Sequence, residues 1–416
     1  MNNYTIITLG PSGAGKTVFL ASLFKLLSIQ GEHGFFLEVE DARKQKLLNK
    51  IYSEVISKET WPRGTRGEIT KWTFTCCVKT PDLSKHPACQ FTYFDYAGGL
   101  LTDTEAEEED DNCFDFRQEI KKADAVLAII DGLKAFSFMQ DSALANSDVL
   151  VWLQRDLTNL MQLVDKCERH TPVHFIISKW DLLESSYSLL QVRNRLLEKV
   201  PEFKNVVHSR NKAGCPIRLI PVSSVGMGFA TLQPDGQMKK KPGAIPRPFQ
   251  VEVPLACVFI DGLQKEISKQ IEKLKLEQKV ILEQPTNVKA NFDLLDQVNR
   301  GWLKIVNVIA LSKLGIRPFL PDKYKINNET LQKLLDLAEQ SVRVIEKKAQ
   351  MTQDEIARKE ALAAQETERL RRLQAESLKK VNDEETALNH AVNSFLNIHQ
   401  KLVKDFPASD LRGAGV

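Results

Sequence analysis

The chain has 416 residues, more than one compact core usually holds, so two or three structural units are expected. With 43% hydrophobic and 27% charged residues, the composition is globular and excludes a wholly disordered or fibrous chain. The 57 basic and 54 acidic residues leave a formal charge of only +3. The charge balance therefore predicts neither nucleic acid nor an anionic membrane surface as a partner.

Cysteine usage and hydropathy predict the cellular compartment of the protein. The seven cysteines include no C-x-x-C pair, which disfavours a disulfide framework or a zinc site and favours a reducing compartment. No apolar run approaches the roughly 20 residues needed to span a bilayer. The start of the chain leads directly into Tyr4–Leu9 and a glycine-rich loop, unlike a signal peptide. We expect a cytoplasmic protein without a membrane span.

Short apolar runs alternate with longer helix-like segments over the first 230 residues. The runs that read as buried parallel strands are Tyr4–Leu9, Phe91–Asp95, Ala125–Asp131, Val173–Ser178 and Arg218–Val222. A further run, Glu68–Thr80, partly alternates and is predicted to pair antiparallel with Phe91–Asp95 at one edge of the sheet. This order predicts a doubly wound α/β domain, with its ligand at the carboxyl ends of the strands.

The composition changes after this region. Residues 232–250 are rich in Pro, Gly and Lys and predict a surface connection, and 253–262 could hold the last helix of an α/β domain over 1–264. We expect a helical connector over 265–326 and a charged long helix or helical hairpin over 327–416. Its apolar spacing covers barely three heptads, which is short for a coiled coil.

Residues 10–17 (GPSGAGKT) match the phosphate-binding pattern G-x-x-x-x-G-K-[ST] and lie between a predicted strand and a predicted helix. Glycines allow consecutive backbone N–H groups to surround a phosphate, while the lysine places a positive charge between the β- and γ-phosphates. The Thr17 hydroxyl is suited to bind Mg²⁺. The residues predicted to hold the nucleotide here are Gly10, Ser12, Gly13, Ala14, Gly15, Lys16, Thr17 and Val18. The alternative is a chance glycine-rich turn.

Asp95 ends an apolar strand and is followed three residues later by Gly98. A carboxylate there would lie near the Mg²⁺, and the Gly98 N–H could reach a γ-phosphate. The D-x-x-G pattern is common by itself and could be a plain turn after a strand.

The sequence Ser178-Lys-Trp-Asp181 ends another strand. The Asp181 carboxylate could accept hydrogen bonds from N1–H and the exocyclic amine of guanine, a donor pair that adenine lacks. The Lys179 stem could lie over the base, and a backbone N–H of Ser223, Ser224 or Val225 could donate to the guanine O6. The alternative is that Asp181 only caps the helix that follows it.

These four motifs resemble, in content and order, the translation-factor-related P-loop GTPases, the class that includes Ras-like switches. Residues 61–65 (WPRGT), together with 254–255, resemble the bacterial double-GTPase-2 group, which is associated with conflict and defence systems. The resemblance implies a catalytic role for Lys16 and a catalytic and metal-binding role for Thr65, with Thr17 and Asp95 as the other metal residues. Thr60 and Thr70 are alternatives to Thr65, and an ordinary loop threonine remains a further interpretation.

Several residues depart from this class. Ser178 stands where Asn is usual, Val225 replaces a frequent Lys, and Ser12 occupies a position that is often Gly. Gly99 stands where many members carry the glutamine that orients the attacking water. Hydrolysis would then be slow, or would use a residue of 102–109 or a partner, although the acidic segment within 103–111 is better explained as a solvated loop.

The sequence therefore predicts a Mg²⁺-dependent protein that binds GTP or GDP, hydrolyses GTP and acts as a switch. A protein partner is expected at the switch loops or the C-terminal helices. Two alternatives stay open: a small-molecule or nucleotide kinase that uses the same loop, and a nucleotide-binding scaffold with negligible hydrolysis.

Overall fold

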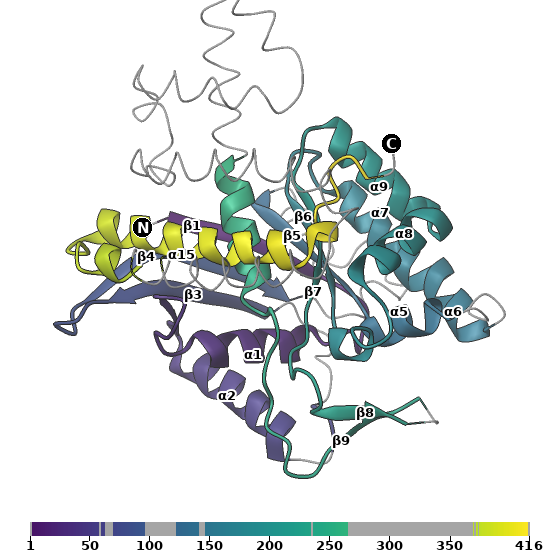
Figure 1. Cartoon of the computed structure of the whole chain (residues 1–416), viewed down its shortest axis with the longest axis horizontal. Helices are drawn as coiled ribbons and strands as arrows, with labels where there is room; N and C mark the ends of the chain where they lie inside the picture. Colours follow the sequence, from purple (N-terminus) through teal and green to yellow (C-terminus); the bar gives the residue numbers. More distant parts are fainter. Residues whose placement is uncertain are drawn as a thin grey trace, which may run out of the picture.

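The computed structural model has a mostly parallel, seven-stranded sheet between two layers of helices (Figure 1). It describes residues 2–57, 60–62, 70–95, 122–140, 146–233, 236–264, 369, 372 and 374–414. The strands are β1 (Asn2–Leu9), β2 (Phe36–Val39), β3 (Thr70–Lys79), β4 (Lys85–Asp95), β5 (Ala125–Ile130), β6 (Val173–Ile177) and β7 (Ile217–Pro221). Their order across the sheet is β2-β3-β4-β1-β5-β6-β7.

The strand directions follow the predicted plan. Strands β4, β1, β5, β6 and β7 are parallel, whereas β3 is antiparallel to both β4 and β2. Strands β2, β3 and β4, which follow β1 in the chain, lie on one side of β1, and β5, β6 and β7 lie on its other side. The strand order therefore reverses beside β1. Ligands of open α/β sheets bind at such a reversal, outside the carboxyl ends of the strands.

Helices cover both faces of this sheet. They are α1 (Lys16–Leu27), α2 (Ala42–Ser57), α5 (Gly132–Phe138), α6 (Ser147–Val151), α7 (Thr158–Lys166), α8 (Leu189–Lys199), α9 (Pro201–Lys212), a helix at 253–264 and α15 (Glu384–Asp405). A π-helical turn at Trp152–Leu157 joins α6 to α7. Short 3₁₀ turns lie at Trp180–Leu182 and Pro407–Ser409.

Strand β5 shows why the central strands read as continuous apolar runs. Leu127 and Ile129 pack with α1, 253–264 and α15 on one face, while Val126 and Ile130 pack with α5, α7, α8 and α9 on the other. All six residues of β5 are buried. A strand covered on both faces has no polar side, so the usual period of two is absent from its sequence.

The structure confirms the predicted strands and corrects their surroundings. Strand β4 begins at Lys85 rather than Phe91, and β3 pairs antiparallel with it as predicted. However, β3 is not the edge strand, because the short strand β2 lies outside it. A further hairpin of β8 (Ala230–Leu232) and β9 (Met238–Lys240) overlaps the start of the predicted surface connection. Strands of three or four residues are too short to give a readable hydrophobic period.

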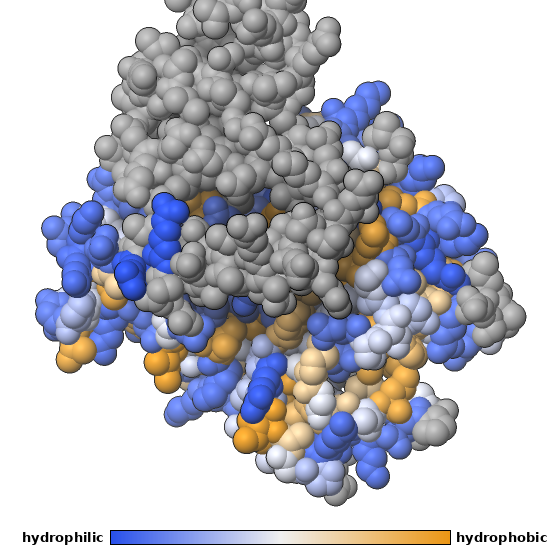
Figure 2. Space-filling model, in the orientation of Figure 1, coloured by the Kyte–Doolittle hydropathy of each residue, from blue (hydrophilic) through white to orange (hydrophobic). Residues whose placement is uncertain are grey.

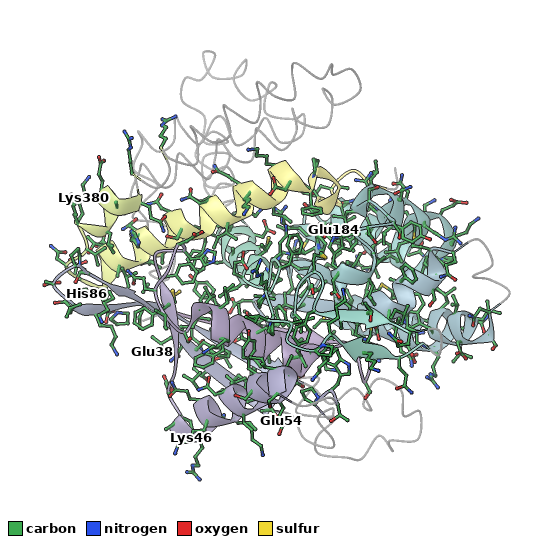
Figure 3. All side chains as sticks on the ribbon, turned by 60° about the horizontal axis from the view of Figure 1, so that its bottom comes forward. Glu38, Lys46, Glu54, His86, Glu184 and Lys380 are labelled. Atoms are coloured by element: carbon green, nitrogen blue, oxygen red, sulfur yellow. The ribbon has the colours of Figure 1, made fainter. Side chains whose placement is uncertain are left out.

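The C-terminal helix α15 is part of the sheet's own core. Phe395 packs against Phe35, Phe91 and Phe259, with ring centroids 4.6, 6.0 and 5.0 Å apart. Figure 1 shows this helix lying across the sheet, and Figure 3 shows Lys380, just before it, near the same end of the molecule as His86 of β4. The predicted boundaries at 265 and 327 lie outside the described residues. The buried residues of α15 include no Asp, Glu, Lys or Arg, so the charged composition of the C-terminal region does not extend to this face of the helix.

The surface in view is mostly hydrophilic. Figure 2 shows separate apolar patches among polar residues on the visible described face. Among the described residues, no helix combines the length and the hydropathy that a bilayer span requires.

A buried ionic cluster lies where β6, β7, 253–264 and α15 meet. Arg218 makes two hydrogen bonds to Asp261, at 2.6 and 2.7 Å, and both side chains are 1% exposed or less. The imidazoles of His174 and His399 lie 3.8 and 4.0 Å from the same carboxylate. Burial lowers the pKa of His174 to about 4 and that of His399 to about 3, with Arg218 adding to both shifts and Asp261 opposing them. Both rings are therefore neutral in the folded protein at neutral pH.

This cluster predicts a loss of stability in mild acid. An unfolded histidine binds a proton near pH 6.5, so between about pH 6.5 and 4 the unfolded chain binds more protons than the folded one and stability falls as pH falls. At pH 5 each buried histidine is expected to cost about 2 kcal/mol. Urea unfolding at pH 7 and pH 5 should show a smaller acid loss in His399→Gln than in the wild type. Replacement of the exposed His208 serves as the control; equal acid losses in the wild type and His399→Gln would refute the assignment.

Candidate functional site

The glycine-rich loop between β1 and α1 has the conformation that its sequence predicts. Gly13 and Gly15 have φ of 79° and 93°, in the left-handed region that side chains disfavour. A Cβ on Gly10 would lie 3.0 Å from the carbonyl oxygen of Ile129 in β5, so this residue also has little room for a side chain. The loop therefore curls over the end of β1 and leads directly into the N-terminus of α1.

Lys16 projects back into this loop. Its Nζ donates to the carbonyl oxygens of Gly10, at 2.6 Å, and Pro11, at 3.2 Å, and the residue is 8% exposed. Burial lowers the pKa of Lys16, and the nearby Asp95 partly opposes this shift. A buried ammonium group inside a loop of backbone N–H groups is suited to an anionic ligand such as a phosphate chain.

Asp95 lies beside Lys16, at the end of β4. The parallel register places it next to Thr8 of β1, and it is 2% exposed. Burial raises its pKa to about 6, opposed by the charge of Lys16 and by a hydrogen bond with the Thr17 side chain. Its Oδ1 has no hydrogen-bond partner among the described residues. A buried carboxylate with an unpartnered oxygen beside a threonine hydroxyl fits the oxygen-rich surroundings that Mg²⁺ prefers.

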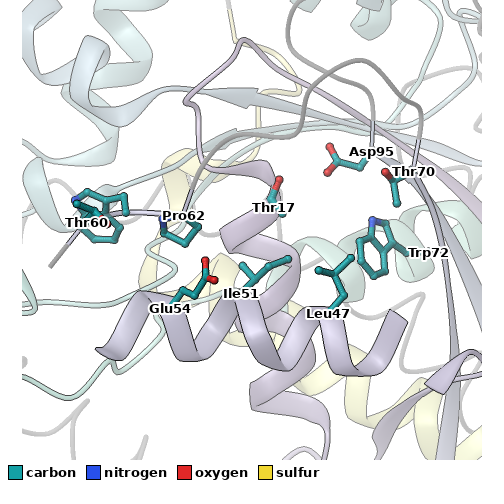
Figure 4. Close-up of a pocket in the computed structure, with 10 residues that line it drawn as sticks. Thr17, Leu47, Ile51, Glu54, Thr60, Pro62, Thr70, Trp72 and Asp95 are labelled. Atoms are coloured by element: carbon teal, nitrogen blue, oxygen red, sulfur yellow. The ribbon is translucent and has the colours of Figure 1, made fainter. Parts of the chain in front are cut away.

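A cavity of about 580 Å³ opens beside these groups (Figure 4). Its polar end carries Thr17 and Asp95, and its apolar wall comes from α2 and β3. The residues that line it are Thr17, Leu47, Ile51, Glu54, Thr60, Trp61, Pro62, Thr70, Trp72 and Asp95. Both alternative switch threonines, Thr60 and Thr70, therefore lie at this cavity. Thr65, Gly98 and Gly99 lie outside the described residues.

The second half of the candidate site reaches the glycine-rich loop through Lys179. This residue has a left-handed backbone, with φ of 50°. Its Nζ donates to the carbonyl oxygen of Gly13, at 3.0 Å, and to the carboxylate of Asp131, at 2.8 Å. The loop after β6 is thus tied to the loop after β1 and to the end of β5. No role was predicted for Asp131 from the sequence, although an aspartate directly after a buried strand is a recognisable sign of a site residue.

Ser178 braces this loop, as the sequence predicted. Its hydroxyl donates to the carbonyl oxygen of Ile130, at 3.2 Å, and accepts from the N–H of Gly132, at 3.4 Å. A Cβ on Gly132 would come within 1.8 Å of the Ser178 carbonyl oxygen, so the close approach requires glycine.

Asp181 does not cap a helix with its side chain. It lies inside the 3₁₀ turn Trp180–Leu182, whose N-cap residue is Lys179 and which has no side-chain cap. The Asp181 Oδ1 instead accepts a hydrogen bond from the Ser223 hydroxyl, at 2.5 Å, and that hydroxyl accepts from the N–H of Gly226, at 2.8 Å. Burial raises the pKa of Asp181, while the bond from Ser223 lowers it. The bond from Ser223 therefore fixes the orientation of the Asp181 carboxylate.

The loop that carries Ser223, Ser224 and Val225 is held by the segment after the β8–β9 hairpin. Ser223 and Phe249 exchange two backbone hydrogen bonds, at 3.0 and 2.7 Å, and the Val225 carbonyl accepts from Arg247. Gly226 has φ of 78° and no room for a Cβ against the Arg247 carbonyl. Sequence reasoning missed this support, because residues 247–249 have no motif of their own.

Those predicted site residues that the structure describes therefore fall into two linked groups at the carboxyl ends of β1, β4, β6 and β7. No protein-family model matches the sequence, and no curated protein matches it. Among the described residues, no cluster of His, Cys, Asp and Glu could hold a metal by protein ligands alone.

Proposed function

We propose that this protein binds a guanine nucleotide with Mg²⁺ and hydrolyses GTP to GDP and phosphate. The observation that carries the proposal is the bridge from Lys179 to Gly13 and Asp131, since it joins a loop suited to phosphates to a loop suited to a base. A kinase or a general phosphate-binding protein would have no use for Asp181, which lies two residues after Lys179 and accepts a hydrogen bond from Ser223.

The phosphate end would use the loop at 10–17. Backbone N–H groups of Gly13–Thr17 would bind the β-phosphate, and Lys16 would leave its carbonyl partners for the β- and γ-phosphates. Thr17 and Asp95, with Thr65 or one of its alternatives, would hold Mg²⁺, which neutralises charge on the phosphate oxygens when it is bound.

The base end would use the loops after β6 and β7. The Asp181 carboxylate would accept from guanine N1–H and from the exocyclic amine, while Lys179 would lie over the base plane. A backbone N–H of Ser223, Ser224 or Val225 would donate to O6. The hydrogen bond from Ser223 supports this role, because it fixes the rotation of the carboxylate before the base arrives.

Within the P-loop GTPases, the translation-factor-related class remains our proposal, and the double-GTPase-2 group a finer proposal within it. Its members' association with bacterial conflict and defence systems suggests a cytoplasmic switch that signals through a protein partner. The γ-phosphate would order the loops that carry Thr65 and Gly98, and hydrolysis would release them.

Hydrolysis is expected to be slow. Because Gly99 offers no side chain to orient water, turnover should fall in the range of about 10⁻⁴–10⁻² s⁻¹ of unassisted switch GTPases, and below the roughly 1–100 s⁻¹ of kinases. Single-turnover hydrolysis of labelled GTP with Mg²⁺, compared with EDTA and with ATP as substrate, tests both the reaction and the nucleotide. Turnover at tens per second, or transfer of label to a small acceptor, would contradict this proposal.

A further inference from the structure

The β8–β9 hairpin is bound to a part of the chain that lies far from it in sequence. Lys240 donates from Nζ to the carbonyl oxygens of Thr60, at 3.0 Å, and Glu54, at 3.2 Å. One ammonium group thus holds both the last turns of α2 and the segment that follows it. Figure 1 shows the hairpin and the end of α2 at the same lower end of the molecule.

Trp61 makes a second set of contacts with the hairpin. Its Nε1 donates to the carbonyl oxygen of Met238, at 2.7 Å, and the Lys240 ammonium lies 4.8 Å from its ring centroid. On another side the ring meets Phe229, with centroids 6.2 Å apart. The segment Thr60–Pro62 is therefore held by a hydrogen bond, a cation–π contact and an aromatic contact.

These contacts continue to both ends of the candidate site. Trp61 belongs to a small apolar cluster with Val55, Phe229, Val225 and Val18. Val225 lies in the loop whose Ser223 bonds to Asp181, and Val18 directly follows Thr17. Thr60 itself lines the cavity that also contains Thr17 and Asp95. The hairpin is thus packed between the loop at 223–225, which is the base-reading loop of the proposed function, and the side of the cavity that carries Thr17 and Asp95.

We infer that Lys240 is a positioning residue for the phosphate and metal end of the site, and that the β8–β9 hairpin links that end to the base-reading loop. The inference rests on the proposed function. The hydrogen bonds described for Lys240 go to Thr60 and Glu54, neither of which is assigned to the base or to the phosphates. It acts through Thr60, whose backbone it fixes at the rim of the cavity, and through Glu54, whose side chain faces the same cavity (Figure 4).

Two neighbouring lysines make the test specific. Lys239 and Lys241 flank Lys240 in the hairpin and are exposed, so Lys239→Met and Lys241→Met change the same net charge without removing these contacts. Lys240→Met removes the ammonium group and keeps most of the aliphatic stem, whereas Lys240→Arg restores a charged donor. Trp61→Phe keeps an aromatic ring at this position but removes the indole N–H that donates to Met238 and part of the ring surface.

The readout is the release of a fluorescent, non-hydrolysable GTP analogue, with Mg²⁺ and with EDTA, beside single-turnover GTP hydrolysis. In Lys240→Met we expect the affinity for this analogue in EDTA to stay within about twofold of wild type, because no base or phosphate contact is lost. The slowing of analogue release by Mg²⁺ and the hydrolysis rate should each fall about tenfold, the loss expected for one net hydrogen bond. Lys240→Arg should recover most of both, and Trp61→Phe should show a smaller loss of the same kind.

The outcomes separate the two levels of the proposal. Lys240→Met behaving like Lys239→Met in a protein that binds GDP would overturn the positioning role alone. An equal loss of affinity for the GTP analogue with and without Mg²⁺ would also overturn it, since that result indicates a general loss of structure. A wild-type protein that binds no guanine nucleotide would instead overturn the proposed function.

Discussion

Replacement of Asp181 by asparagine is expected to convert the protein from a GTP binder into a xanthosine triphosphate binder. Xanthine carries an oxygen where guanine carries its amine, so it needs a donor, which an amide supplies and a carboxylate does not. In the structure, Ser223 donates to Oδ1 of Asp181, so an asparagine oxygen would keep that partner and direct its NH₂ toward the base. Loss of two hydrogen bonds to a charged group, at roughly 1.5–3 kcal/mol each, should weaken GTP by at least about a hundredfold.

Competition binding of GTP, ATP and xanthosine triphosphate to both proteins measures this change. Glu184→Gln is the matched control, because Glu184 is an exposed acid three residues further along the chain. Its nucleotide preference should equal that of the wild type. Equal affinity of the wild type for ATP and GTP, or a folded Asp181→Asn protein with no gain for xanthosine triphosphate, would refute guanine recognition.

Replacement of Lys16 by alanine is expected to weaken GTP and GDP by at least about a hundredfold, since charge-assisted hydrogen bonds to phosphate are the strong ones. The folded state should tolerate the change. In the ligand-free protein, burial already lowers the pKa of Lys16, so its charge is held at a cost that alanine removes. Binding is therefore lost while thermal stability changes little.

Isothermal titration with a non-hydrolysable GTP analogue, beside a thermal melt, checks both parts. Lys25→Ala is the control, because Lys25 lies in the last turn of the same helix and is exposed. Unchanged affinity and turnover in Lys16→Ala would remove the glycine-rich loop from the mechanism.

Much of the sheet could be predicted because its signals are local. Strands such as Ala125–Ile130 are continuous apolar runs that end in Asp or Ser, and their order along the chain follows directly. The loop at 10–17 was also readable, since the positive φ angles of Gly13 and Gly15 are local requirements of the backbone. Strand β2 and the β8–β9 hairpin escaped prediction, because three or four residues carry no readable period.

The sequence by itself determined the α/β sheet, the glycine-rich loop before Lys16, and the residue types at the ends of the strands. Only the tertiary structure decided which of those ends meet. The bond from Lys179 to Gly13 joins residues 166 apart, and that from Lys240 to Thr60 joins residues 180 apart. The docking of α15 was decided in the same way, because its buried face becomes distinct only where Phe395 meets Phe91 and Phe259. Local patterns depend on neighbours along the chain, whereas these contacts depend on how the packed layers bring distant segments together.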